Sequence, residues 1–331
     1  MRLILALMLS LMFMPLLAGF QAAATESEQE TRTPLTPEVA RQFKQQVQEI
    51  AVVAVIDPLT FSDANGNVYR LAAIDVPDMY SANAPDLVRE ARDYVAGFVK
   101  GAKLKLYQAK NENKGRSNRM GQQLVHVAKY PANEWLQGEL VAKGFARVWP
   151  DADNPEAYLE LLALEDQARA ANLGLWALPQ YRVLADTQAE AGRFAIVRGK
   201  VLSVSTQSNM LFLNFGHDWR TDFTIGVSPA MRRELAKKQI DIQSYAGKNI
   251  EVRGMVENYY GPFINLMDIS QLRIVEEAAP SIAEPAKPQA TTVQPEKPQA
   301  SGQNRALRSL SVSPLPDTDL ETSRTTTSQE K

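Results

Sequence analysis

Two neighbouring segments carry most of the information in this chain: Ile56-Asp57-Pro58-Leu59-Thr60, and Tyr69-Arg70-Leu71-Ala72-Ala73-Ile74-Asp75-Val76-Pro77-Asp78. The first continues the β-branched run 51–56, which predicts a strand. Asn65-Gly66 between the segments is a hairpin turn signal, so residues 69–74 are expected to return as the next strand. Charged side chains therefore gather where two adjacent strands end.

Further motifs follow at regular spacing. Residues 38–49 have the pattern of a short amphipathic helix. Asp86 is predicted to cap a helix to about Lys100, Asn133 a helix to Lys143, and a longer helix is expected over 155–172. The two most distinctive segments are Leu140-Val141-Ala142-Lys143-Gly144-Phe145-Ala146-Arg147-Val148 and Glu165-Asp166-Gln167-Ala168-Arg169-Ala170-Ala171-Asn172-Leu173-Gly174-Leu175-Trp176.

These ordered motifs resemble the thermonuclease (staphylococcal-nuclease-like) family over roughly residues 50 to 180. The resemblance implies a mainly β, α+β fold: an OB-type five-stranded barrel with packed helices. Family membership does not by itself establish activity, because function depends on the residues of the site.

The resemblance implies a calcium-dependent phosphodiesterase site, which this sequence matches only in part. Arg70 is expected to contact phosphate, Asp75 and the Val76 backbone carbonyl to bind metal, and Asp57 is a further metal candidate. Leu59 stands where the family has a second metal-binding Asp. Two catalytic positions also differ: Asp78 replaces a longer Glu, and Gln122 replaces an Arg whose charged fork suits phosphate.

These departures predict weak or absent Ca²⁺ binding and leave three functions open. The leading expectation is a non-catalytic or weakly catalytic binding module for nucleic acid, nucleotide or an envelope partner. The alternatives are a working calcium-dependent nuclease acting on DNA or RNA, and an envelope protein-interaction scaffold. Residues 37–180 hold sixteen Lys/Arg against eighteen Asp/Glu, so this part lacks an overall basic footprint. Within it, Arg116 and Arg119 are local candidates for phosphate contact.

The second half, residues 192–276, is expected to be a smaller OB-like barrel with strands at 192–201, 210–215, 222–227, 249–256 and 262–266 and a helix at 229–238. It resembles a small domain that sometimes follows exported thermonuclease-like domains, through the elements 214–220 and 261–264. Eleven Lys/Arg against eight Asp/Glu give it a net charge of +3. Its ligand-binding candidates are the aromatic and basic residues Trp219, Arg220, Tyr259 and Tyr260. Trp149, in the first half, is a further candidate. The alternative is that the aromatic rings serve packing alone.

The ends of the chain indicate export. Residues 1–24 read as a signal peptide, with Arg2, an apolar run 3–20 and the cleavage site Ala22-Ala23-Ala24; an uncleaved anchor is the alternative. Residues 25–37 are a predicted linker, 38–180 the thermonuclease-like domain, and 277–331 a disordered tail rich in Pro, Ala, Gln, Ser and Thr. The protein is expected to be periplasmic or secreted, with no membrane span after cleavage. It has no Cys, so it forms no disulfide.

Several common site types are missing from the sequence. It contains no P-loop, dinucleotide-binding fingerprint, zincin motif or G-x-S-x-G elbow. His126 and His217, the only histidines, are far apart in the chain, which argues against a zinc site or catalytic triad.

Overall fold

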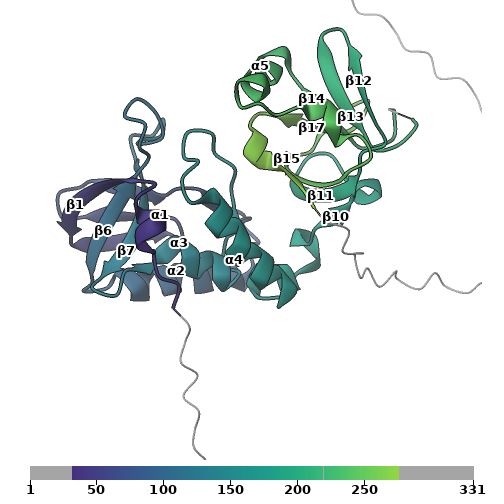
Figure 1. The fold of residues 1–331 in the computed structure, drawn as a ribbon. Helices are drawn as coiled ribbons and strands as arrows, with labels where there is room; N and C mark the ends of the chain where they lie inside the picture. The colour runs from purple at the N-terminus through teal and green to yellow at the C-terminus, as the bar shows by residue number, and fades with distance from the viewer. Residues whose placement is uncertain (1–31, 219, 276–331) are drawn as a thin grey trace, which may run out of the picture. The chain divides into compact units, whose positions relative to one another are not determined.

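The computed structural model describes residues 32–218 and 220–275, and these residues form an α+β fold (Figure 1). All the described residues lie in one compact unit. The predicted signal peptide, most of the linker, the tail and Trp219 lie outside the described residues. In the described part, no helix has the length and apolar character needed to cross a membrane.

The first sheet follows the order β1-β6-β7-β4-β3-β2, with β8 paired to β7. β1 and β2, at its two edges, are separated only by Ala51, so one bent chain segment forms both edges. β4 and β7 run parallel, and the other neighbours along this order run antiparallel. The strands are β1 (Lys44–Ile50), β2 (Val52–Asp57), β3 (Thr60–Asp63), β4 (Val68–Leu71), β6 (Lys103–Gln108), β7 (Gln123–Tyr130) and β8 (Glu134–Trp135).

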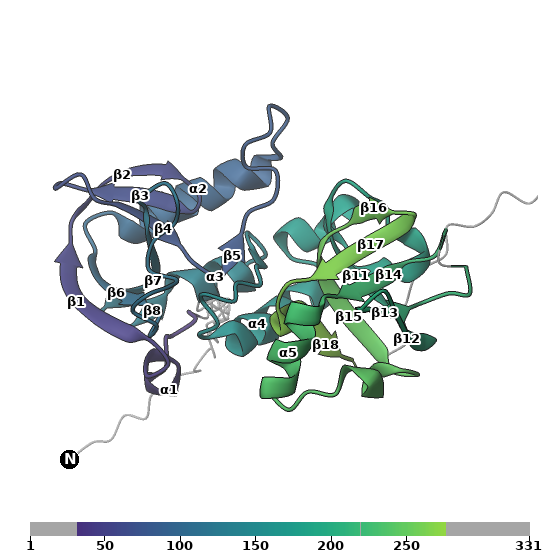
Figure 2. The same ribbon diagram turned by 90° about the horizontal axis from the view of Figure 1, so that it is seen from above.

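Four helices belong to this first half: α1 (Pro37–Ala40), α2 (Asp86–Val99), α3 (Leu136–Ala142) and α4 (Tyr158–Ala170) (Figure 2). The helix predicted over 38–49 is wrong, because the chain leaves α1 and pairs as β1 with β6, so tertiary pairing outweighs the local pattern. Asn133 does not cap α3; it precedes β8, and α3 begins only after that short strand.

The second half repeats this strand order. Its five-stranded sheet runs β12-β13-β14-β17-β16 and its four-stranded sheet β10-β11-β15-β18, with β14 and β17 parallel. One segment supplies β11 and β12, and another β15 and β16. The elements are β10 (Leu184–Ala185), β11 (Phe194–Lys200), β12 (Ser203–Gln207), β13 (Met210–Asn214), β14 (Thr224–Val227), α5 (Pro229–Lys237), β15 (Asn249–Met255), β16 (Glu257–Tyr259), β17 (Gly261–Leu266) and β18 (Leu272–Ile274).

The predicted strands at 249–256 and 262–266 do not form a hairpin with each other. β17 forms its hairpin with the short strand β16, whereas β15 pairs with β11 and β18. The identification of this half as an OB-like domain, and the boundaries at 180 and 192, remain predictions; the repeated strand order is what supports them.

Each half has its own apolar core, and a buried ion-pair cluster joins α4 to the second half. Glu165 on α4 and Glu251 on β15 are both almost fully buried. Arg253 lies between them, with Nη2 2.9 Å from Glu165 Oε1 and 3.1 Å from Glu251 Oε1. Burial opposes ionisation of Glu251, but four surrounding arginines outweigh it and hold its pKa well below the usual range. The ion-pair cluster comprises Glu165, Asp166, Arg169, Arg198, Glu251, Arg253 and Arg273.

Candidate functional site

The first group of site residues lies at the turn between β2 and β3. The Asp57 carboxylate closes this turn by accepting a hydrogen bond of 2.8 Å from the backbone N–H of Leu59. Arg70, opposite Thr60 on β4, donates to the Thr60 hydroxyl at 3.0 Å and lies 3.9 Å from the Asp57 carboxylate. The Tyr80 hydroxyl approaches both, at 3.3 Å from Arg70 and 3.4 Å from Asp57. This group joins one cation and one anion, so its formal charges cancel.

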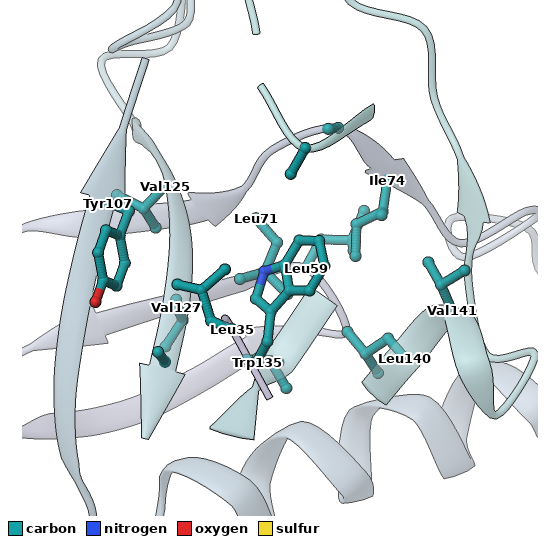
Figure 3. Close-up of a cluster of buried hydrophobic side chains, with 14 of the residues drawn as sticks. Leu35, Leu59, Leu71, Ile74, Tyr107, Val125, Val127, Trp135, Leu140 and Val141 are labelled. Carbon is teal, nitrogen blue, oxygen red and sulfur yellow. The ribbon is translucent and has the colours of Figure 1, made fainter. Parts of the chain in front are cut away.

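Leu59 belongs to the hydrophobic core. Its side chain is 1% exposed, and Figure 3 shows it in the apolar cluster with Leu71, Ile74 and Trp135. A leucine side chain has no atom that can bind a metal ion. This one also points into the core of the protein, which excludes water.

The Asp75 carboxylate forms an ion pair with an arginine and is not available as a free ligand. It lies on β5 (Ile74–Asp75), opposite Arg147 on β9 (Arg147–Val148). Nε and Nη2 of Arg147 both donate to Asp75 Oδ2, at 3.0 Å and 2.7 Å. The guanidinium also lies 4.0 Å from the ring centroid of Phe194, which stacks on Trp149. The Arg147 guanidinium thus already neutralises the carboxylate that the resemblance implies as a metal ligand.

Asp78 makes a different internal contact. Its carboxylate accepts a hydrogen bond of 2.5 Å from the Tyr181 hydroxyl. Burial and, next, this hydrogen bond raise the pKa of Tyr181 to about 12, so the phenol remains a proton donor at neutral pH. Asp78 also has a left-handed backbone, with φ of 57°, which is uncommon outside glycine.

The arginine candidates on the loop before β7 do not converge on these acids. Arg116 donates hydrogen bonds to the backbone carbonyls of Ala109 and Lys110, so its side chain stabilises the loop to which it belongs. Arg119 is exposed. Gln122 accepts a hydrogen bond of 2.7 Å from the Asn118 amide within the hairpin. The structure therefore supplies no second guanidinium from the position of Gln122.

The comparison with known families identifies the part of the chain that carries this site. Residues 68–178 match the family model described as staphylococcal nuclease homologue. The chain contains a domain of this family. No curated protein matches the chain. The matched range of this nuclease-like domain includes Arg70, Asp75, Asp78 and Gln122, but it begins after Asp57 and Leu59.

The residues of the nuclease-like domain do not fit a calcium ion. Calcium takes six to eight oxygen ligands, several of them from carboxylates. Asp75 is paired with Arg147, Asp78 with Tyr181, and Leu59 is buried in the core. Across residues 32–218 and 220–275, no three His, Cys, Asp or Glu side chains gather as a metal-binding group. Val76 still has a backbone carbonyl, but one carbonyl does not make a site.

The aromatic and basic ligand-binding candidates lie in different places. Trp149 packs on Phe194, with ring centroids 4.9 Å apart. Tyr259 and Tyr260 lie together on the rim of a cavity in the five-stranded sheet. Arg220 is exposed on the loop before β14. Both histidines are apart from the nuclease-like site: His126 is buried in β7, and His217 borders the cavity.

Sequence reasoning missed Arg147, Tyr181 and Phe194. Arg147 stood within a quoted motif, but nothing local shows that it faces Asp75, 72 positions away. Tyr181 lies beyond the last motif. A signal did exist for the cavity, because Ser203, Ser205 and Gln207 alternate along one face of a strand.

Proposed function

We propose that this protein is an exported binding protein that uses a nuclease-like domain without efficient phosphodiester hydrolysis. The observation that carries the proposal is the ion pair between Asp75 and Arg147. A cation entering this site competes with a guanidinium held by two hydrogen bonds, and it finds no carboxylate at Leu59 to compensate.

The missing phosphate clamp supports the same conclusion. Phosphodiester hydrolysis needs positive charge where negative charge develops, and losing one such donor costs about 3 kcal/mol in typical sites. Gln122 is neutral, and its amide is engaged by Asn118. Of the two positions where the resemblance implies an arginine, only Arg70 carries one. A single guanidinium is better suited to binding an anion than to catalysing its hydrolysis.

Nucleic acid or nucleotide is the first ligand class to test, because nuclease-like domains commonly bind nucleic acids. Export is proposed from the sequence of residues 1–24. An envelope protein partner is the other outcome, and binding of a single-stranded oligonucleotide that weakens as salt rises distinguishes the two.

Calorimetric calcium titration and a single-stranded DNA hydrolysis assay with calcium test the proposal. We expect no saturable calcium binding and no hydrolysis above that of Asp75→Asn. Asp93→Asn, the same change at an exposed position of α2, controls for nonspecific effects of lost charge. Submicromolar calcium affinity together with hydrolysis that Asp75→Asn abolishes and Asp93→Asn preserves would make the protein a working calcium-dependent nuclease.

A further inference from the structure

A cavity of about 420 Å³ lies on the outer face of the five-stranded sheet in the second half. Its volume is within the range of small-molecule sites. Strand pairing aligns its walls: Ser203 and Ser205 on β12 face Asn214 and Phe212 on β13, and Thr224 on β14 lies beside Phe263 on β17. Residues two apart on a strand share a face, so these side chains point into one hollow.

The floor of the cavity depends on a glycine. A Cβ at Gly226 would lie 2.2 Å from the Phe263 ring and 3.3 Å from the Met210 methyl group. The ring therefore lies directly over the backbone of β14. Phe263 and Thr224 are both buried, which gives the hollow an aromatic floor with a hydroxyl group beside it.

The wall offers hydroxyl and amide groups. The Asn214 amide donates to the hydroxyls of Ser203 and Ser205, at 3.2 Å and 3.1 Å. This arrangement fixes three polar side chains in one row along β12 and β13. Hydroxyl and amide groups both donate and accept hydrogen bonds, so the row matches a ligand that carries hydroxyl groups.

Two exposed tyrosines form the rim. Tyr259 and Tyr260 are 56% and 69% exposed, with ring centroids 5.3 Å apart and planes at 79°. Tyr260 has a φ of 68°, an uncommon conformation for a bulky residue that concentrates at functional positions. Gly261 allows the hairpin tip to approach the loop before β14, since a Cβ there would lie 3.1 Å from the Asp222 carbonyl oxygen.

The charge of the residues that line the cavity distinguishes an uncharged ligand from a nucleic acid. Among the described residues that line the cavity, none is Lys, Arg, Asp or Glu. Arg220 and Asp222 lie on the adjoining loop with opposite charges. A nucleic acid needs cations to neutralise its phosphates, and these walls supply no Lys or Arg. The perpendicular tyrosines also form a corner instead of a flat platform for successive bases.

We infer that this cavity binds an uncharged oligosaccharide. A sugar ring has a hydroxyl edge, which suits the row of Ser203, Ser205 and Asn214, and a C–H face, which suits the aromatic floor and rim. The cavity is separate from the nuclease-like site, so this inference can be tested independently of the proposed function.

The test is calorimetric titration of the full chain with chitotetraose, cellotetraose and maltotetraose. At least one should bind with a dissociation constant below about 1 mM, and its affinity should not change between low and high salt. Tyr260→Gly should weaken binding about tenfold while keeping the fold, because glycine accepts this backbone conformation without strain. Tyr259→Ala, at an exposed position, should weaken it similarly.

Gln239→Gly is the matched control. Gln239 is exposed after α5, has a φ of 58° and does not line the cavity, so its replacement should leave binding unchanged. Failure of all three sugars to bind would overturn the inference. Binding that Gln239→Gly weakens as much as Tyr260→Gly would also overturn it. Salt-dependent binding of a deoxythymidine oligomer that Tyr260→Gly abolishes, with no sugar binding, would make the cavity a nucleic-acid site.

Discussion

The side chain of Leu59 occupies a core position next to a turn where the resemblance led us to expect a metal-binding carboxylate. We expect Leu59→Asp to lower the free energy of unfolding by roughly 3 kcal/mol or more, because burying an unpaired charge is costly. Leu59→Met conserves volume and should cost less than about 1.5 kcal/mol. Urea unfolding measures both. If the two variants are equally stable, the Leu59 position can open to water and our placement of it is wrong.

His126 gives a prediction about pH. It is 2% exposed, and its Nδ1 accepts a hydrogen bond from the Trp135 indole N–H at 3.3 Å. Burial lowers its pKa to about 3, against an ordinary value of about 6.5 in the unfolded chain. Between these values the unfolded state binds more protons, so stability is full above pH 6.5 and falls as pH drops through this window.

Comparing stability at pH 7 and pH 5.5 isolates this histidine, because most carboxylates remain ionised over that range. The loss should be about 1 kcal/mol. His126→Gln keeps an acceptor for Trp135 but does not titrate, so its stability should change much less between the two pH values. An equal loss in His126→Gln would mean that other groups cause the dependence.

Local sequence signals predicted features formed by neighbouring residues, but they did not predict features that depend on pairing between distant strands. The Asn65-Gly66 signal correctly predicts a hairpin turn, but the strand that pairs with β4 across it is β3, which the sequence reading did not identify. The loss of a ligand at Leu59 could also be read directly from the motif. The pairing of Arg147 with Asp75 could not be read in this way, since it depends on β5 meeting β9, a pairing set by the folded core. For the same reason β1 was mistaken for the end of a helix.

The ion-pair cluster between α4 and β15 leads to a prediction at this level. Glu251→Gln should lower the free energy of unfolding by about 3–5 kcal/mol, because it leaves buried arginines without their counter-charge. Glu257→Gln makes the same change at an exposed position of β16 and should stay within about 0.5 kcal/mol of the parent. Thermal or urea unfolding separates the two. Equal stability would show that the cluster is solvated.

Across residues 32–275, each half has its own core, yet both contribute charges to the ion-pair cluster. We therefore expect the halves to unfold together, as one calorimetric transition, despite their separate cores. Glu251→Gln should divide this transition into two, because it removes the ion pair with Arg169 between the halves and also destabilises the second half, where the other three arginine partners of Glu251 lie. Two resolved transitions in the parent protein would show that the cluster does not couple them.

The ion-pair cluster also affects how such a chain can be inherited. A gene fragment that moved the nuclease-like segment alone into another protein would carry Glu165 and Asp166 without Arg253 and Arg273, which lie in the second half. The transplanted helix would keep Arg169 as a partner for both acids but would lose the other two arginines, so recombination at this junction would be penalised. The two halves are thus expected to pass together through descent, and a solitary relative should carry a different residue at the position of Asp166, which pairs with Arg273 of the second half.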